Sequence, residues 1–242
     1  MKSGWRREGG WVRLADWERR FGVVAVVSSR QLGNMKDGSV FRRQCREGGL
    51  DPDQWVGGQQ VHGARVARVA RPREKEKPRT DGVVTRTPGL TLRILTADCV
   101  PVFLIDPVRR AMGLVHAGWR GVHKGIVKKA VRRFSMDFQC RTENICVAFG
   151  PHIQNCCYDV GPDLAALFQG IPGAISMGKT GGEGGKLSLS LVLRAQLREV
   201  GVSGTRLTLA PGCTFCDRTY FSYRRDQTHE RQAALLCLKS KR

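Results

Sequence analysis

Residues 94–106 read ILTADCVPVFLID and residues 113–121 read GLVHAGWRG. Each stretch contains an apolar run of strand length bounded by turn signals, which is typical of a buried β-strand. Asp98, Cys99 and His116 interrupt this pattern where the runs begin or end. A buried strand needs neither a thiolate nor an imidazole. The two stretches therefore predict a pair of core strands that carry reactive groups at their ends.

Length and composition limit what these groups can belong to. The chain has 242 residues, of which 41% are hydrophobic, so it can bury one substantial core, and we expect a single domain over residues 1–242. No apolar run reaches the roughly 18 to 20 residues that span a bilayer, and the charged amino-terminal residues lack the apolar centre of a signal peptide. We expect a cytoplasmic monomer without a membrane partner.

The charge and the cysteines narrow the classes of partner. The 41 Lys and Arg residues exceed the 21 Asp and Glu residues, and the formal charge of +20 should attract polyanions and small anions alike. The basic residues are spread along the whole chain with few aromatics among them, which favours a solvated basic surface over a nucleic-acid site. Nine cysteines scattered through apolar segments indicate reduced core residues, metal ligands or reactive thiols, not a secreted disulfide framework.

The order of the expected elements predicts an α+β fold, because strands and helices mix without strict βαβ alternation. A short apolar run predicts a strand over Phe21–Ser28, and apolar residues at helical spacing predict a helix over residues 123–134. Residues 72–80, with prolines and alternating charge, should form an exposed loop, and the glycine-rich residues 178–186 a flexible one. Further helices are expected within residues 40–50, 162–170 and 189–201, and further strands within residues 55–70, 144–161 and 206–210.

His62, Cys99 and His116 are candidate metal ligands. They lie 37 and 17 residues apart, so no local ligand spacing links them, but each lies at a strand-to-loop junction or beside a glycine. Two neutral imidazoles and one thiolate suit Zn²⁺, and three protein ligands leave a fourth position open, as in catalytic zinc sites. A single copper ion in the same three-ligand site remains an alternative.

Seven motifs in this order resemble one known family: QVHGARV, DGVVT, TADCVPVFLID, GLVHAGWRG, GPHIQNCCYDVG, CTFC and YFSYRRD. The chain is similar, from about Ser28 to the carboxyl end, to the YfiH/YlmD-type polyphenol oxidase (laccase-domain) proteins, which are regarded as purine nucleoside phosphorylases. The resemblance implies a mixed β-sandwich flanked by helices and one zinc held by His62, Cys99 and His116. It implies phosphorolysis of adenosine, inosine, guanosine and methylthioadenosine, deamination of adenosine and, in older descriptions, copper-dependent phenol oxidation.

The same resemblance directs the search for catalytic and phosphate-binding residues. Asp98, beside the ligand Cys99, is expected to act with His62 and Cys99 in catalysis, by orienting a histidine or by binding a sugar hydroxyl; a turn-capping role is the alternative. The family carries an Asn-Arg pair upstream of QVHG, whereas this chain reads SVFRRQCREGG there. The planar guanidinium suits phosphate oxygens, and the candidates for inorganic phosphate are Arg42, Arg43, Arg120 and Arg224, with Arg225 as a rival of Arg224.

Other functions fit the residues less well. A cytidine-deaminase-type zinc site fails, because no Glu follows His116 and a glycine separates Pro211 from Cys213. Cys213 and Cys216 could form a redox pair, but no thioredoxin-like pattern precedes them. The adjacent Cys156 and Cys157 are not expected to point into one site. A multicopper cluster needs many histidines, whereas the chain has five, of which His123, His152 and His229 have no evident link to the site. A basic nucleic-acid-binding protein is the non-enzymatic alternative.

Overall fold

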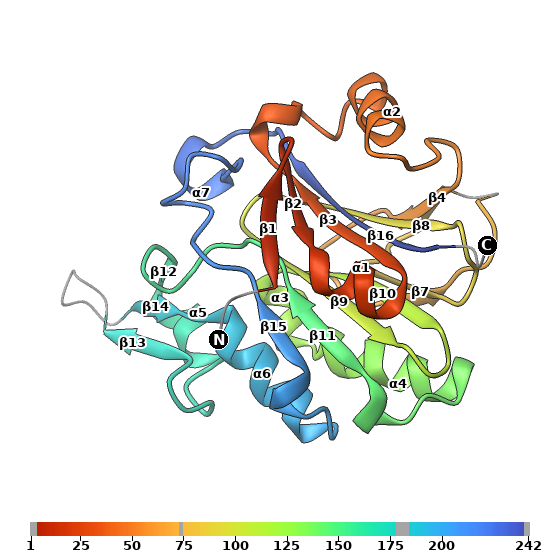
Figure 1. Ribbon diagram of the computed structural model, residues 1–242. Helices are drawn as coiled ribbons and strands as arrows, with labels where there is room; N and C mark the ends of the chain where they lie inside the picture. The colour runs from red at the N-terminus through yellow and green to blue at the C-terminus, as the bar shows by residue number, and fades with distance from the viewer. Residues whose placement is uncertain (1–3, 73–74, 178–183, 240–242) are drawn as a thin grey trace.

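The computed structural model describes residues 4–72, 75–177 and 184–239. It confirms the predicted α+β fold with a mixed β-sandwich flanked by helices (Figure 1). None of the helices in these ranges is long and apolar enough to cross a membrane.

One layer of the sandwich is a seven-stranded sheet with the strand order β1-β2-β3-β16-β8-β4-β6. The strand nearest the carboxyl end, β16, pairs antiparallel with both β3 and β8, so it lies in the interior of this sheet. The strands are β1 (Trp5–Glu8), β2 (Trp11–Leu14), β3 (Val23–Ser28), β16 (Gln232–Leu238), β8 (Thr91–Thr96), β4 (Trp55–Gly58) and β6 (Glu76–Lys77).

The second layer is a six-stranded sheet with the order β15-β11-β9-β10-β7-β5, and a small sheet, β12-β14-β13, lies beside it. The apolar runs within residues 94–106 and 113–121 contribute to its central antiparallel pair, β9 and β10. The strands are β15 (Leu207–Leu209), β11 (Cys146–Phe149), β9 (Val100–Asp106), β10 (Ala111–Ala117), β7 (Gly82–Thr85), β5 (Val66–Arg68), β12 (Asp159–Val160), β14 (Gly185–Leu187) and β13 (Ile175–Met177).

Helices cover the outer faces of both sheets. Figure 1 shows α2 above the seven-stranded sheet and α4 and α6 below the six-stranded one. The helices are α1 (Ala15–Phe21), α2 (Gly38–Glu47), α3 (Trp119–His123), α4 (Ile126–Phe138), α5 (Pro162–Ala166), α6 (Leu189–Glu199) and α7 (Tyr223–Asp226), with 3₁₀ turns η1 (Arg30–Leu32), η2 (Thr142–Asn144) and η3 (Gly204–Arg206).

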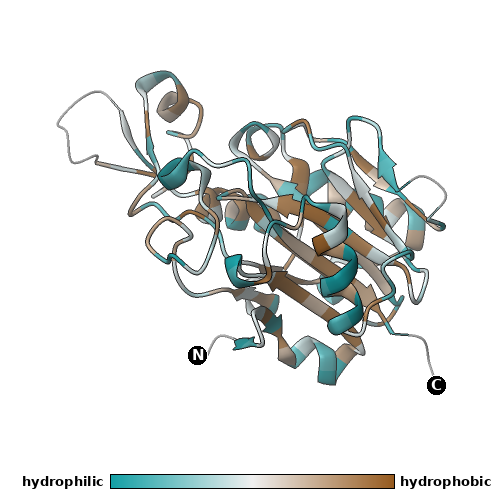
Figure 2. Cartoon of the chain, turned by 90° about the horizontal axis from the view of Figure 1, so that it is seen from above, coloured by the Kyte–Doolittle hydropathy of each residue, from teal (hydrophilic) through white to brown (hydrophobic). Residues whose placement is uncertain are grey.

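The hydrophobic core consists of three apolar layers between these elements. Phe103 and Leu114 of the six-stranded sheet pack against Leu236 and its neighbours in the seven-stranded sheet. On the outer face of the six-stranded sheet, the apolar side of α4, which includes Phe134, packs with α6, and Phe41 of α2 covers the other outer face. In Figure 2 the apolar residues accordingly concentrate on the strands in the interior. β9 and β10, buried along their whole length, form a rigid base for the groups at their ends.

Several sequence-based expectations need correction. The predicted strand from Phe21 begins at Val23, because Phe21 is the last residue of α1. Residues 72–80 are not wholly a loop, since Glu76–Lys77 form the edge strand β6 beside β4, where the Gly57 N–H donates to the Lys75 carbonyl at 2.7 Å. Of the predicted flexible segment 178–186, residues 178–183 lie outside the described residues, and Gly185–Leu187 form β14.

Candidate functional site

The structure brings His62, Cys99 and His116 together. Their ligand atoms all lie within 4.8 Å of one another, and the two imidazole centroids are 4.9 Å apart. The strand pairing explains this, because His116 pairs with Pro101 near the start of β9, directly after Cys99 in the turn from β8. His62 reaches the same point from the connection between β4 and β5. Three segments far apart in the sequence therefore supply two nitrogens and one sulfur to one point.

Asp81, just before β7, holds the two histidines in place. Its carboxylate lies 3.0 Å from His116 Nδ1 and accepts backbone N–H groups from His62 (2.9 Å) and Gly63 (2.8 Å). The bonds to the backbone hold His62 at a φ of 56°, a left-handed conformation that is uncommon for a residue with a side chain. With Nδ1 of His116 facing Asp81, Nε2 is the nitrogen left for a metal, and a carboxylate behind a ligating imidazole is the usual support of a zinc-binding histidine.

The electrostatics of the site favour a thiolate beside a charged imidazole when no metal is bound. Burial disfavours the charged form of Cys99, but His116 and His62 outweigh it and lower the pKa of the thiol to about 6. Burial likewise disfavours the imidazolium of His116, but Cys99 and Asp81 raise its pKa to about 9. The site thus favours the thiolate form that a metal requires, and metal binding would release the proton of the His116 imidazolium.

The local packing fits a small ion at this point. A Cβ added to Gly118 would lie 2.8 Å from the His62 ring and 3.0 Å from Cys99 Sγ, so any larger residue would push the ligands apart. The donor set, two imidazoles and one thiolate, matches the preference of Zn²⁺ and leaves room for a fourth ligand. The residues present therefore fit zinc.

The hydrogen bonds of the Asp98 carboxylate go to the carboxyl-terminal segment. Asp98 is buried with a φ of 90°, and its carboxylate accepts the Thr214 hydroxyl at 2.6 Å and the Arg224 backbone N–H at 2.7 Å. The structure thus gives it neither the predicted role of orienting a histidine nor that of a simple turn cap. It ties the β8–β9 turn to the carboxyl-terminal segment, and it also lines the pocket over His62, Cys99 and His116.

A pocket of about 680 Å³ opens over the three ligands. This volume lies within the range of about 300 to 1,000 Å³ that small-molecule sites occupy. Trp119 and Tyr158 supply aromatic surface, and His62, Cys99 and His116 all face the cavity. Its basic side chains are Lys36, Arg120, Arg224, His229 and Arg231. Potential metal ligands, aromatic surface and cations thus line one cavity of the size of a small organic ligand.

Only two of the four predicted phosphate-binding arginines line this pocket. The guanidinium of Arg120 lies 4.5 Å from the Trp119 ring, and that of Arg224 lies 4.9 Å from the Tyr158 ring. Arg42 and Arg43 are on α2 and do not line the pocket; Arg42 instead forms two hydrogen bonds with Asp53, at 2.8 and 3.2 Å.

The rival Arg225 has a structural role. Its guanidinium donates to the backbone carbonyls of Thr214, Phe215 and Tyr220, each at 2.8 Å. These three bonds fix the loop before α7, so Arg225 supports the wall of the pocket.

Sequence reasoning missed Asp81, Lys36, Arg231 and His229. Asp81 is the first residue of the motif DGVVT, and membership of this motif was the one available signal for it. No local pattern marks the others, because Lys36 lies before α2 and Arg231 directly before β16, and only the pairing of β16 inside the sheet brings them close.

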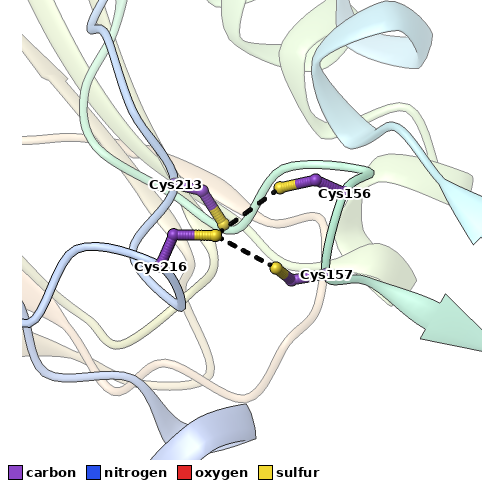
Figure 3. Close-up of side chains that lie close together, drawn as sticks. All are labelled: Cys156, Cys157, Cys213 and Cys216. Carbon is purple, nitrogen blue, oxygen red and sulfur yellow. Dashed lines mark hydrogen bonds between the residues drawn. The ribbon is translucent and has the colours of Figure 1, made fainter.

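A second group of possible metal ligands lies outside this pocket. Cys156, Cys157, Cys213 and Cys216 place all four sulfur atoms within 4.8 Å of one another (Figure 3). The expectation that Cys156 and Cys157 diverge is wrong, because residues 155–157 form a turn, in which adjacent side chains need not alternate as they do in a strand.

Comparison with known proteins places these features in a family. Residues 39–239 match the family described as "Multi-copper polyphenol oxidoreductase laccase". The chain is 38% identical, over 90% of its length and 93% of the relative's, to purine nucleoside phosphorylase SCO2081 of Streptomyces coelicolor. It is 32% identical to purine nucleoside phosphorylase YlmD of Geobacillus stearothermophilus, over 72% of this chain and 68% of YlmD.

Solved structures agree with these sequence matches. The crystal structure of YlmD from Geobacillus stearothermophilus superposes with a TM-score of 0.89 at 28% identity, over 98% of this chain and 100% of that one. The structure of Bacillus licheniformis YfiH gives a TM-score of 0.88 at 26% identity, over 98% and 99% of the two chains. The similarity therefore extends over both sheets and the site.

Proposed function

Because the chain belongs to the multi-copper polyphenol oxidoreductase laccase family, in which similar proteins carry the name purine nucleoside phosphorylase, we propose that it is a zinc-dependent purine nucleoside phosphorylase. The observation that carries the proposal is the His62, Cys99 and His116 cluster at the base of a pocket with cationic side chains around it. Its substrates would be adenosine, inosine, guanosine and methylthioadenosine with inorganic phosphate, and it would also deaminate adenosine.

Each class of residue in the pocket has a role in this proposal. His62, Cys99 and His116 would hold the zinc, and Asp81 would keep His116 in the correct tautomer through its Nδ1. A bound zinc ion supplies a Lewis acid and lowers the pKa of water in its open position. The aromatic rings of Trp119 and Tyr158 offer surfaces on which a purine can stack.

The cations around the pocket would bind inorganic phosphate. Arg120 and Arg224 present guanidinium groups, whose donor geometry matches phosphate oxygens. Arg224 is partly fixed, because its Nη1 donates to the Asp159 carbonyl at 2.6 Å. We assign these two arginines to phosphate, and we propose that Asp98 positions Arg224 through its bond to that residue's backbone N–H.

The cysteines also bear on where the enzyme works. All nine are free thiols, and a chain that depends on the Cys99 thiolate needs a compartment in which thiols stay reduced. We therefore propose that it acts in the cytoplasm.

The test is product analysis with adenosine, inosine or methylthioadenosine, each with and without phosphate. We expect free base and ribose 1-phosphate, or the corresponding methylthioribose ester, only with phosphate, and inosine from adenosine even without it. Cys99→Ala should abolish both reactions. Arg120→Ala and Arg224→Ala should raise the phosphate requirement about ten- to a hundredfold and spare deamination, because a hydrogen bond to a charged group contributes about 1.5 to 3 kcal/mol.

Arg42→Ala and Arg43→Ala are the matched controls, because both arginines lie on α2, away from the pocket, and both variants should behave as the wild type does. If one of them shows the phosphate defect instead, the phosphate site is misplaced. If no nucleoside is altered and a phenol is oxidised, the protein is a copper-dependent phenol oxidase and not a purine nucleoside phosphorylase.

Copper in the same three-ligand site is the second candidate, and the family description favours it. Among the described residues, His62, Cys99 and His116 form the one potential metal group that contains histidine. A copper enzyme built here would therefore use a single ion, and elemental analysis of protein purified without added metal distinguishes it from a zinc enzyme.

A further inference from the structure

Four cysteines from two distant segments meet on the side of the molecule beside β12 (Figure 3). Cys156 and Cys157 lie in the turn between β11 and β12, and Cys213 and Cys216 lie between β15 and α7. Cys157 Sγ is 3.2 Å and Cys156 Sγ is 3.9 Å from Cys216 Sγ. The proposed function uses none of these side chains.

The spacing of the sulfurs fits a shared ion. Zinc binds thiolate sulfur at about 2.3 Å, so four thiolates around one tetrahedral zinc lie about 3.8 Å from one another. The two Sγ–Sγ distances to Cys216, 3.2 and 3.9 Å, lie close to that value, and no ligand atom in the group is more than 4.8 Å from another. Cys213 and Cys216 also have the C-x-x-C spacing that contributes two ligands to many structural zinc sites.

Backbone groups support negative charge at this point. The Gln154 backbone N–H donates to Cys213 Sγ at 3.2 Å, and the backbone N–H groups of Phe215 and Cys216 donate to the same sulfur. Three donors on one sulfur stabilise a thiolate, the form that coordinates a metal. Cys156 and Cys216 are exposed, so an ion can enter from solvent.

A redox function for Cys213 and Cys216 fits the geometry less well. A reactive C-x-x-C thiol usually lies at a helix N-terminus, whereas residues 214–216 form a turn and the next helix, α7, begins only at Tyr223. A two-cysteine redox centre also leaves the convergence of Cys156 and Cys157 unexplained.

We propose that Cys156, Cys157, Cys213 and Cys216 bind a second Zn²⁺, separate from the ion at His62, Cys99 and His116. Four thiolates fill the tetrahedral shell, so this zinc is structural and has no open position for substrate. It cross-links the turn after β11 to the segment before α7.

This cross-link would support the wall of the pocket. Thr214, between the two cysteines of the C-x-x-C pair, donates its hydroxyl to Asp98, and Tyr158, which follows Cys157, lines the pocket. One ion would thus hold the segments that carry Tyr158 and Thr214 in a fixed relation, which connects the second zinc to the shape of the proposed active site.

The test is the zinc content of protein purified under reducing conditions and freed of loosely bound metal. The wild type should hold two zinc ions per chain. Cys99→Ala should retain one, and the double variant Cys213→Ser/Cys216→Ser should also retain one. Cobalt substituted into Cys99→Ala should give the intense charge-transfer absorption of several thiolate ligands, and Cys156→Ser, a change at an exposed residue that the fold should tolerate, should weaken it. Cys45→Ser, at a buried thiol of α2 that belongs to neither group, is the matched control and should retain two ions.

The results separate this inference from the proposed function. One zinc in the wild type that is lost entirely in Cys99→Ala overturns the inference and leaves the proposed function intact. Fewer than nine reactive thiols in wild-type protein that has been denatured with chelator would also overturn it, because disulfides would then account for the cluster. If the wild type holds two zinc ions but turns over no nucleoside, the second zinc site is confirmed and the proposed phosphorylase activity is wrong.

Discussion

Asp81 holds the candidate metal site together through one carboxylate. One of its oxygens faces His116 Nδ1 and accepts the His62 backbone N–H, so both histidine ligands depend on the same group. Burial raises the pKa of this carboxyl, but His116 and the donated N–H groups outweigh burial and lower it, so the carboxylate stays charged at neutral pH. A neutral group at this position would support both ligands less well.

We expect Asp81→Asn to weaken zinc binding about tenfold to a hundredfold, because residues that support a ligating histidine typically contribute that much to metal affinity. Competition with a chromogenic chelator measures the change. Asp163→Asn, an exposed residue of α5, is the control and should bind zinc as the wild type does. Equal affinities in the two variants would mean that Asp81 does not support the ligands.

The buried His152 should make the folded protein less stable in acid. It is buried, its Nδ1–H donates to the Gly150 carbonyl at 2.8 Å, and its Nε2 accepts from the Gln154 side-chain amide at 2.9 Å. Burial lowers the pKa of His152 from 6.5 to about 4. Between these values the unfolded chain binds a proton that the folded chain does not, so the free energy of unfolding should fall by about 3 kcal/mol as the pH drops from 6.5 to 4.

His152→Gln should be less stable at neutral pH and should lose that part of the pH dependence, whereas the exposed control His229→Gln should keep the wild-type slope. Urea unfolding at several pH values measures both. An unchanged slope in His152→Gln would assign the acid sensitivity to other groups.

At the scale of elements, local sequence patterns predicted most of the helices and strands but few of the pairings between strands. The helical spacing of Ile126 to Phe134 predicted α4 because one apolar face recurs with the helical period. The pairing of β16 with β3 and β8 was not predictable, because it joins residues about 140 to 210 positions apart, and no short-range pattern encodes such a contact.

The same distinction holds for the site. The candidate ligands Cys99 and His116 stood out because a thiol and an imidazole interrupt apolar strands. Lys36 and Arg231 did not, since a cation beside a pocket has the same sequence signature as one on a solvated surface. Arg42 and Arg43 show the reverse case, because this basic pair upstream of QVHG lies on an outer helix and does not line the pocket.

Thr214 joins the carboxyl-terminal segment to the β8–β9 turn through a buried hydrogen bond to Asp98. We expect Thr214→Val to lower the free energy of unfolding by about 1.5 to 3 kcal/mol, because it keeps the shape of the side chain but removes the hydroxyl that donates to the buried Asp98 carboxylate. Urea denaturation measures the loss, with zinc content determined on the same samples. Thr214→Ser keeps the hydroxyl and should recover most of the stability. Equal losses in both variants would point to packing of the missing methyl group.

At the scale of the molecule, the formal charge of +20 raises the concentration of anions near the surface, and the pocket adds its own cations. A general field of this kind attracts phosphate and nucleic acid alike. The number of phosphates contacted distinguishes them, since each one adds to the dependence of binding on salt.

We expect the apparent KM for inorganic phosphate to rise only shallowly with ionic strength, whereas binding to a DNA duplex, measured by fluorescence anisotropy, should fall steeply with salt. His62→Ala should abolish nucleoside turnover and leave the weak duplex binding unchanged. Tight duplex binding that survives in this variant, together with no turnover in the wild type, would identify a nucleic-acid-binding protein.

The interior position of β16 sets the order in which the molecule can be completed during synthesis. β3 and β8 leave the ribosome early, but each keeps an unpaired edge until residues 232–238 have emerged. Translation at roughly 5 to 20 residues per second delays that moment by on the order of ten seconds after β8. During this interval two apolar strand edges are open to chaperones or to pairing with other nascent chains. The seven-stranded layer can therefore close only after residues 232–238 have been synthesised.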